Sequence, residues 1–356
     1  MSSQTHLEQT QLDIGIVALT DCAPLVMAKH LGYFEQWGLD VSLHVQYSWA
    51  TVRDRLNAGL LDAAQVLAPM PIASSLGLNG PKCDVINAFN LSMNGNGVTL
   101  STALMDKVRE LNNGITPPLP LEAKWLKRVI DQSGEVLKIA SVYPYSCHFY
   151  QLRDWLISGD ITPNKDVELI IIPPTSMTTA LQNNDIDGFC VGTPWNAQAV
   201  RGGIGETVTT SSDIWQEAPE KVLAVTKEWQ ETNPNTYLAL LAAVQQACEW
   251  LESVANRFET AIILQQYLDA PVDVIAPSLI GSCITAKGAP PRDIPGYNQF
   301  FRSNTNQPIV EQGMFLIEKM KGAGQLGDWT DTQLNEVVNN VYRNDLYESM
   351  LALRNS

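Results

Sequence analysis

The sequence predicts an α/β protein of two lobes, each a mostly parallel sheet flanked by helices. Three observations support this prediction. The 356 residues exceed what one simple core accommodates and suit two domains of ordinary size. Hydrophobic residues make up 45% of the chain and charged residues 17%, which is typical of a globular protein. A pattern of strands and helices also occurs twice with the same spacing.

The repeat is a strand–helix–strand–helix–strand unit. Ile14 precedes Pro69 by 55 positions, and Ile139 precedes Pro194 by 55 positions. Such alternation is typical of parallel sheets, because a parallel connection needs a crossover of about helix length. The first copy predicts a strand over 13–18, a helix over 24–34 and strands over 39–43 and 61–64; the second predicts a strand over 138–142, a helix over 149–157 and strands over 165–169 and 186–189.

The rest of the chain connects and completes the lobes. Residues 94–97, Asn-Gly-Asn-Gly, predict a turn, after which a strand over 98–100 crosses to the second lobe. A strand over 221–225 returns the chain to the first lobe, on which the helical C-terminal third is expected to pack. We therefore expect lobe 1 to comprise 12–99 and 222–356, lobe 2 to comprise 100–221, and residues 1–11 to be disordered.

Composition excludes several function classes. A formal net charge of −15 argues against nucleic acid or an anionic membrane as a direct partner. No apolar run approaches the ~20 residues of a membrane span. Six scattered cysteines without a CxxC pair indicate reduced, mostly buried thiols. The repeat places Cys22, Cys147 and Cys190 near the cleft, where we expect them to be buried and not catalytic. With four histidines and no HExxH motif, neither a metal site nor a cofactor is expected.

The repeat directs several helix N-termini toward one cleft, since ligands of open α/β sheets bind beyond the carboxyl ends of the strands. Helices are expected to begin near Asp21, near Ser146 and after Pro69. Another is expected at Thr193-Pro194, as N-cap and first helical residue. Helix N-termini favour anions, so the cleft suits an anion despite the overall charge. Because a carboxylate would repel an anion, Asp21 is expected to be an N-cap and not a ligand.

Four segments carry a resemblance to a known family. They are ALTDCAPLVMAKHLGYFEQWGLDV (18–41), SWATVRDRLNAGLLDAAQVLAPMP (48–71), GFCVGTPWN (188–196) and APEKVLAVTKEW (218–229). These segments resemble the nitrate- and bicarbonate-binding proteins of ABC importers and the cytosolic nitrate/nitrite sensors of the NasS type. The resemblance covers 12–235 strongly and the C-terminal part loosely. It implies a periplasmic-binding-protein-like fold of type II, with the ligand cleft between the lobes.

The resemblance also implies the ligand-contacting residues: Trp49, Asn96, His148, Gly192 and Lys221. Asn96 falls where importers of this family tend to carry glutamine, which keeps an amide donor but shortens it. Bicarbonate-binding relatives carry an acidic residue at the position of Lys221, so a lysine there favours nitrate or nitrite. An indole, an amide, an imidazole, backbone N–H groups and an ammonium suit such a weakly basic oxyanion. We expect Lys221→Glu to abolish anion binding and to leave thermal unfolding nearly unchanged.

Without the resemblance, these residues have simpler explanations. Trp49 ends an alternating strand and would be a core residue or a strand-end cap. His148 would be an exposed residue at a helix start, and Lys221 a solvated lysine before a strand. Arg53 and Asp54, one turn into a helix, are expected to form a structural pair.

Three functions remain to be compared. The absence of GxSxG and GxxxxGK[ST] motifs argues against an enzyme, although thiamin-pyrimidine-synthase-like enzymes share the fold superfamily and stay the second alternative. The binding component of a nitrate/bicarbonate ABC importer is the first alternative; such a protein usually carries a signal peptide or a lipid-anchored cysteine, and residues 1–11 resemble neither. The preferred hypothesis is a cytoplasmic nitrate/nitrite sensor. Ligand would close its lobes and thereby release a NasT-like RNA-binding antiterminator protein.

Overall fold

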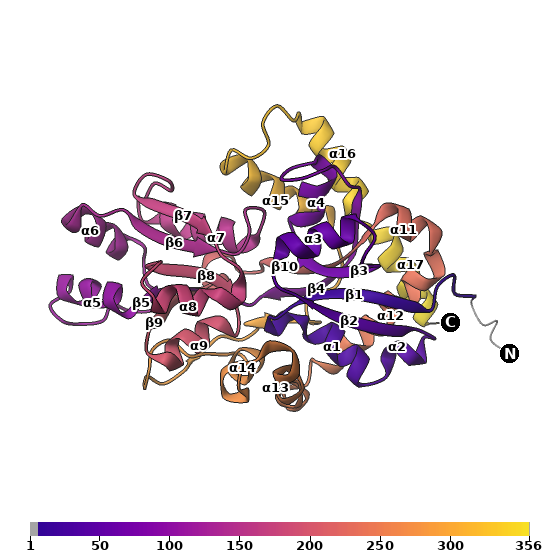
Figure 1. Ribbon diagram of the computed structural model, residues 1–356, viewed down its shortest axis with the longest axis horizontal. Helices are drawn as coiled ribbons and strands as arrows, with labels where there is room; N and C mark the ends of the chain where they lie inside the picture. The colour runs from indigo at the N-terminus through magenta and orange to yellow at the C-terminus, as the bar shows by residue number, and fades with distance from the viewer. Residues whose placement is uncertain (1–5, 356) are drawn as a thin grey trace.

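The computed structural model describes residues 6–355, which form two lobes that lie side by side (Figure 1). The first lobe has a sheet of strand order β13-β4-β10-β3-β1-β2, and the second has a sheet of order β7-β6-β8-β5-β9. The predicted two-lobed α/β fold is confirmed. The strands are β1 (Gln11–Val17), β2 (Asp40–Gln46), β3 (Ala63–Leu67), β4 (Val85–Asn94), β10 (Pro219–Thr226) and β13 (Asn298–Gln299) in the first sheet, β5 (Asn96–Ser101), β6 (Leu137–Ser141), β7 (Val167–Ile171), β8 (Gly188–Gly192) and β9 (Gly205–Thr210) in the second, and a separate ribbon of β11 (Ser282–Cys283) and β12 (Arg292–Asp293).

Helices cover both faces of each sheet. In the first lobe α3 and α4 lie over one face and α1 and α12 over the other, and α16 packs on α4 (Figure 1). Within residues 6–355 no helix is both long enough and apolar enough to cross a bilayer. The helices are η1 (Thr20–Cys22), α1 (Ala23–His30), α2 (Tyr33–Gln36), α3 (Trp49–Asn57), α4 (Met70–Leu76), α5 (Thr102–Leu111), α6 (Lys124–Ser133), α7 (Cys147–Ser158), η2 (Pro174–Ser176), α8 (Met177–Gln182), α9 (Trp195–Gly202), α10 (Ser211–Ile214), α11 (Lys227–Thr232), α12 (Pro234–Trp250), α13 (Val254–Leu268), α14 (Val272–Leu279), α15 (Val310–Gly322), α16 (Asp331–Val341) and α17 (Asn344–Arg354).

The repeat extends to the register of the strands. β1 pairs in parallel with β3, with Ile14 opposite Ala63. β6 pairs in parallel with β8, with Ile139 opposite Gly188. Each residue of the second pair lies 125 positions after its counterpart (139 − 14 and 188 − 63), so the two copies share one alignment without a gap between these strands.

An aspartate fixes this register in both copies. The Asp62 carboxylate accepts the backbone N–H of Asp13 at 2.7 Å, and the Asp187 carboxylate accepts that of Lys138 at 2.8 Å. Each aspartate stands directly before the third strand of its copy and binds the start of the first. The acidic residues that made the repeat visible in the sequence therefore have a structural role.

The strands that join the lobes make both sheets mixed, and not mostly parallel as predicted. β5 is antiparallel to β8, and β10 is antiparallel to β3 and β4, because these strands run back between the lobes. The turn predicted over 94–97 is wrong: β4 continues into β5 with only Gly95 between them, at φ 95°. The second lobe therefore begins at Asn96 and not at residue 100. The predicted strand over 221–225 exists as β10, which places Lys221 in the first lobe instead of the second.

Part of the N-terminal segment expected to be disordered is held on the first lobe. Gln9 donates its backbone N–H to Thr236 Oγ1 at 3.1 Å, and the Glu8 carboxylate accepts the Thr236 N–H at 2.9 Å. Thr10 accepts the Asp40 N–H at 2.7 Å. The prediction is wrong for residues 6–11, while residues 1–5 lie outside the described part of the chain.

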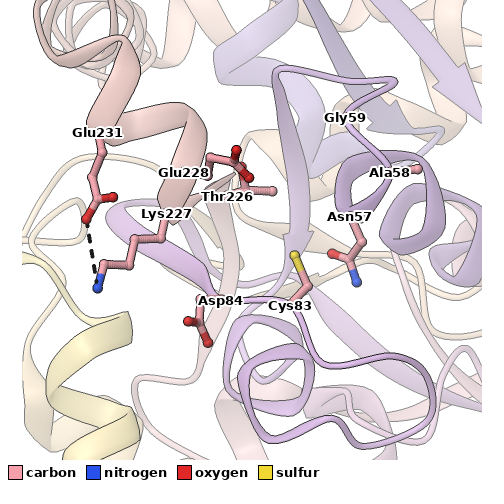
Figure 2. Close-up of a pocket in the computed structure, with 9 residues that line it drawn as sticks. All are labelled: Asn57, Ala58, Gly59, Cys83, Asp84, Thr226, Lys227, Glu228 and Glu231. Atoms are coloured by element: carbon pink, nitrogen blue, oxygen red, sulfur yellow. Dashed lines mark ion pairs between the residues drawn. The ribbon is translucent and has the colours of Figure 1, made fainter.

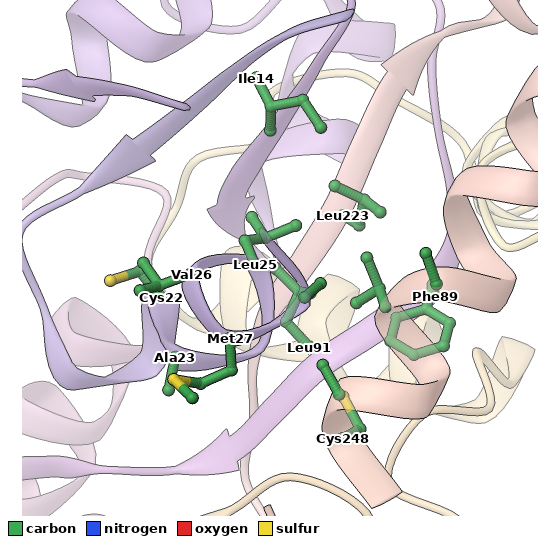
Figure 3. Close-up of a cluster of buried hydrophobic side chains, with 14 of the residues drawn as sticks. Ile14, Cys22, Ala23, Leu25, Val26, Met27, Phe89, Leu91, Leu223 and Cys248 are labelled. Atoms are coloured by element: carbon green, nitrogen blue, oxygen red, sulfur yellow. The ribbon is translucent and has the colours of Figure 1, made fainter. Parts of the chain in front are cut away.

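The core of the first lobe encloses helix α1. Figure 3 shows Leu25 of α1 facing Leu91 and Leu223 of the sheet, with Cys248 of α12 beside Phe89. All five side chains are completely buried, and burial of a leucine contributes roughly 1.5–3 kcal/mol. This packing fixes the start of α1 and, with it, η1 at the edge of the cleft. Among the C-terminal helices, α12 packs on α1 and α17 on β4 of the first lobe, while α14 also contacts α9 of the second lobe.

Candidate functional site

Lys221 lies at the centre of a buried polar cluster between the lobes. Its side chain is completely buried, and Nζ lies 2.8 Å from Asp21 Oδ2 and 2.6 Å from Glu220 Oε1. An ammonium group has three N–H donors, so one is left for a further acceptor. The two carboxylates come from η1 and β10, both in the first lobe.

Glu220 is a site residue that the sequence reasoning missed. In a regular strand neighbouring side chains point to opposite faces, so a lysine in the cleft would place Glu220 outside it. β10 is irregular here, because its pairing with β4 shifts register between Pro219 and Lys221 and again between Lys221 and Val222. This β-bulge brings both charged side chains into the cluster. Pro219, which cannot donate to a ladder, is the one sign of it in the sequence.

Asp21 is a counter-ion of Lys221 and not a helix N-cap, which corrects the prediction. Its Oδ1 accepts a hydrogen bond from Gln65 Nε2 at 2.5 Å, and its Oδ2 accepts from Lys221. Gln65 Oε1 accepts the Val17 N–H at 3.0 Å, which fixes the orientation of the amide. Both oxygens of Asp21 therefore face fixed donors. The repulsion expected between this carboxylate and an anion is offset by the adjacent ammonium.

Asn96 is completely buried at the start of β5. Its Nδ2 donates to Glu220 Oε2 at 2.6 Å and to Gln151 Oε1 at 3.0 Å, and its Oδ1 has no partner. In this arrangement the free atom of Asn96 is an oxygen, whereas the predicted contact uses its N–H. The free amide nitrogen is instead Nε2 of Gln151, a second residue that the sequence reasoning missed.

His148 lies one turn before Gln151 in α7, so both side chains project from the same face of the helix. The ring is completely buried and neither nitrogen has a hydrogen-bond partner; Nδ1 lies 3.4 Å from Glu220 Oε1. Burial lowers the pKa of His148 well below its ordinary value, and the Lys221 charge adds to this shift. The imidazole is therefore neutral, with one N–H to donate. His148 is not the exposed residue of the simpler explanation.

Trp49 is the first residue of α3 and not a strand end, because β2 stops at Gln46 and Ser48 caps the helix by accepting the Thr51 N–H at 3.2 Å. The indole is completely buried, with Lys221 Nζ 5.5 Å from the ring centroid. Its Nε1 has no partner. Buried indole N–H groups usually donate a hydrogen bond, so this donor marks a place for an acceptor.

Gly192 ends β8 directly opposite Asn96. A Cβ added there would lie 3.5 Å from Asn96 Oδ1, 3.5 Å from Asp21 Oδ2 and 3.3 Å from Leu19 Cδ2. The missing side chain thus leaves space beside the polar groups of both lobes. Taken with the contacts above, the structure brings all five residues expected to contact a ligand into one cluster.

With both carboxyl groups ionised, the cluster carries one more negative than positive charge, because two carboxylates face one ammonium. Burial raises the pKa of Asp21 and of Glu220, although Lys221 opposes both shifts. Burial also acts to lower the pKa of Lys221, but the two carboxylates outweigh it and the net shift is upward. Lys221 is therefore a stable cation, and one carboxyl group has no cation of its own.

The helix ends around the cleft match the prediction in part. Ser146 caps α7 as expected, with its Oγ accepting the Phe149 N–H at 3.0 Å, and so places the positive end of that helix at the cluster. Thr193 is not the N-cap of α9, because Pro194 occupies that position. Instead Thr193 Oγ1 lies 2.5 Å from Thr20 Oγ1, a hydrogen bond between the lobes.

Further polar contacts join the lobes nearer the surface. Arg53 and Asp54 form the predicted pair, with Nε to Oδ1 at 2.8 Å. Arg53 also donates to the Tyr143 hydroxyl of the second lobe at 2.8 Å. Tyr47 Oη lies 2.9 Å from Ser176 Oγ on the opposite lobe. The structure therefore represents a closed arrangement of the two lobes.

The cysteines near the cluster are buried, as predicted. Burial raises the pKa of Cys22, Cys147 and Cys190, so their thiols stay protonated and unreactive. Across the described chain, residues 6–355, no group of three or more His, Cys, Asp or Glu side chains is arranged to hold a metal ion.

A separate hollow of about 600 Å³ lies on the first lobe, away from the cluster (Figure 2). Its one cation, Lys227, lies 3.8 Å from Glu231. Two further carboxylates, Asp84 and Glu228, also line it, so an anion gains nothing there. The polar cluster between the lobes is therefore the better candidate for an anion site.

The fold has counterparts in known proteins. A family model described as the NMT1-like family matches residues 5–265. The chain belongs to the NMT1-like family. It is 31% identical over 353 residues to the nitrate/nitrite binding protein NrtA of Nostoc, covering 96% of this chain and 77% of the relative. It is 38% identical over 333 residues to the bicarbonate transport ATP-binding protein CmpC of Synechococcus elongatus, covering 91% of this chain but 46% of that relative.

Among solved structures, this NMT1-like chain is similar to the periplasmic nitrate-binding protein NrtA from Synechocystis. The TM-score is 0.90 at 28% identity, and the match covers 98% of this chain and 90% of the other. The chain spans about half the length of the transport ATP-binding relatives that it matches. These relationships place the chain among binding proteins and not among enzymes, as predicted.

Proposed function

We propose that this protein binds nitrate or nitrite in the cluster between its lobes. The observation that carries the proposal is a set of buried donors without partners around Lys221: Trp49 Nε1, Gln151 Nε2 and a ring nitrogen of His148. A hydrogen bond to a charged group contributes roughly 1.5–3 kcal/mol. Four such donors, counting the free N–H of Lys221, are enough for micromolar affinity, about 8 kcal/mol, after ordering costs.

Two lines of support distinguish the anion. NrtA relatives are named for nitrate and nitrite, and the cationic Lys221 stands where bicarbonate-binding relatives are expected to carry an acid. Calorimetric titration with nitrate, nitrite and bicarbonate in turn tests the choice. Micromolar heat with nitrate or nitrite alone is the expected result. Heat with bicarbonate alone would identify bicarbonate as the ligand instead. No heat with any of the three anions, in a folded sample, would show that the cluster is not an anion-binding site.

We further propose that the protein acts in the cytoplasm as a nitrate/nitrite sensor. The donors come from both lobes, Trp49 and Lys221 from the first and His148 and Gln151 from the second, so a bound anion favours the closed state. A NasT-like RNA-binding antiterminator would bind the open state more tightly and be released on closure. The test is the affinity of the two proteins with and without nitrate. Equal affinity under both conditions would refute the sensor role.

The alternative is the substrate-binding component of a nitrate importer, which the likeness to NrtA supports as directly. An importer component should stimulate ATP hydrolysis by its reconstituted membrane transporter in the presence of nitrate, and should bind no antiterminator. The two roles predict opposite results in these two experiments, which therefore separate them.

A further inference from the structure

The buried cluster has no compensation for a second negative charge. Asp21 and Glu220 as carboxylates and Lys221 as an ammonium sum to −1, and an added anion would bring the sum to −2. All three side chains are at most 2% exposed. Uncompensated charge in such surroundings is strongly unfavourable, and a protein commonly responds by taking up a proton. The question is which group receives it.

Asp21 is arranged to stay ionised. One of its oxygens accepts from Lys221 and the other from Gln65. The Gln65 amide cannot turn, because its own oxygen accepts the Val17 N–H at 3.0 Å. A proton on Asp21 would therefore meet a donor at each oxygen and lose a hydrogen bond.

Glu220 is arranged differently, because its neighbours can accept a proton. Oε2 faces the Asn96 amide, whose other end is an oxygen without a partner. If this amide turns, Asn96 Oδ1 accepts the proton of a neutral Glu220, and Asn96 Nδ2 takes the place of the free oxygen beside Gly192. The Gln151 amide turns with it, so the contact between the two amides is kept and the free atom of Gln151 becomes its oxygen. Protonation of Glu220 thus moves the free donor of the amide pair from Gln151 Nε2 to Asn96 Nδ2, beside Gly192.

The imidazole gives a second, independent reason. Nδ1 of His148 lies 3.4 Å from Glu220 Oε1, and Nε2 is the nitrogen left for a ligand. A neutral ring that donates Nε2–H to an anion has a bare lone pair on Nδ1. That lone pair is repelled by a carboxylate and tolerated by a neutral carboxyl group. The turned Asn96 amide and the His148 ring therefore favour neutral Glu220 when an anion is present, whereas Lys221 favours the carboxylate.

We propose that the protein binds its anion together with one proton taken from solvent, which neutralises Glu220. The inference rests on the proposed function, because it concerns the charge state of the same site. Asn96 is then a positioning residue that presents a donor only when Glu220 is neutral. Burial, which raises the pKa of Glu220, acts in the same direction. The titratable and charged groups facing Glu220 are Asp21 from η1, Lys221 from β10, Cys147 and His148 from α7, and Cys190 from β8.

The primary experiment is calorimetric titration of the full chain with nitrate in pairs of buffers of different ionisation enthalpy, over about pH 5 to 9. Above the pKa of Glu220 in the free protein, one proton should be taken up per anion, and the affinity should fall about tenfold per pH unit. Nitrate that binds without proton uptake throughout this range would overturn the inference. If nitrate, nitrite and bicarbonate all fail to bind, the proposed function fails, and this inference fails with it.

Infrared difference spectroscopy locates the proton. Binding of nitrate should produce the carbonyl band of a neutral carboxyl group, and Glu220→Gln should lack this band, take up no proton and bind with an affinity that no longer follows pH. Glu217→Gln is the matched control, since Glu217 is exposed three residues earlier, and it should behave like the wild type. A band that persists in Glu220→Gln, or proton uptake in the wild type without any band, would place the proton on another group.

Discussion

Replacement of Lys221 by methionine is expected to destabilise the protein strongly and in a manner that depends on pH. The substitution keeps most of the apolar stem and removes the ammonium that faces two buried carboxylates at 2.6 and 2.8 Å. Breaking a buried ion pair by removing one partner typically costs about 3–5 kcal/mol. The expectation from the sequence that Lys221→Glu leaves unfolding nearly unchanged does not fit this burial, because a third carboxylate would join the cluster.

The direction of the pH dependence follows from the carboxyl groups. The pKa values of Asp21 and Glu220 are already raised by burial, and loss of Lys221 removes the interaction that opposes the shift. A carboxyl group whose folded pKa lies above its unfolded value, about 4, contributes stability below that value and loses it as pH rises through the folded pKa. The defect in Lys221→Met should therefore be smallest near pH 4 and largest near pH 8.

Urea unfolding of wild type and variant at about pH 5 and about pH 8 measures the effect. Lys227→Met is the matched control, because Lys227 is 45% exposed and lies 3.8 Å from Glu231; it should change the free energy of unfolding by less than about 1 kcal/mol. A Lys221→Met protein within about 1 kcal/mol of the wild type at the higher pH would refute the account of Lys221 as the compensating charge. If Lys221→Met loses the same free energy of unfolding at both pH values, the carboxyl groups do not cause the expected pH dependence.

Three further predictions concern the cleft and the fold. Trp49→Phe removes one unpartnered N–H and leaves a smaller aromatic ring, so nitrate affinity measured by calorimetry should fall about tenfold or more in a protein that still folds; full affinity would show that Trp49 does not contact the anion. Gly192→Ala meets only contacts of 3.3–3.5 Å, so the protein should fold but bind nitrate weakly, and unchanged binding would show that the anion does not lie beside Gly192. Gly159→Ala would place Cβ within 2.5 Å of the backbone at Lys124 and should lower stability by more than about 1 kcal/mol, whereas Gly322→Ala, with nothing within 4 Å, should not; equal stability of the two variants would contradict this.

The fold was predictable because its signal is local and occurs twice. Hydrophobic strands, the spacing to Pro69 and Pro194, and the aspartates at 62 and 187 are all visible in short stretches of sequence. The exact places where the chain changes lobe were not predictable, because the Asn-Gly-Asn-Gly segment over 94–97 has the composition of a turn. In the structure this segment is the joint of two strands, and only the pairing of Asn96 with Gly192 shows it.

The site was predictable only where a resemblance supplied the positions. Regular alternation along a strand would place the Glu220 side chain outside the cleft. The β-bulge that brings it into the cluster depends on the pairing of β10 with β4, which the sequence does not show. Asp21 was set aside because one carboxylate repels an anion, and the charge that compensates it lies 200 positions away at Lys221. Gln151 could have been found, because it lies one helical turn after His148.

The repeat also explains how an acidic protein can build an anion site. Residues 125 positions apart are equivalent, so Asp21 corresponds to Ser146 and Ala23 to His148. The first lobe holds Lys221 between carboxylates, which leaves that lobe without a net positive charge to offer. The second copy has a capped helix start and a neutral imidazole there, which donate without adding charge. Neither lobe alone attracts an anion strongly. Affinity should arise only when closure of the lobes removes water and places the neutral donors beside the ammonium. Binding at such a site depends on whether the lobes are open or closed and little on the net charge of −15.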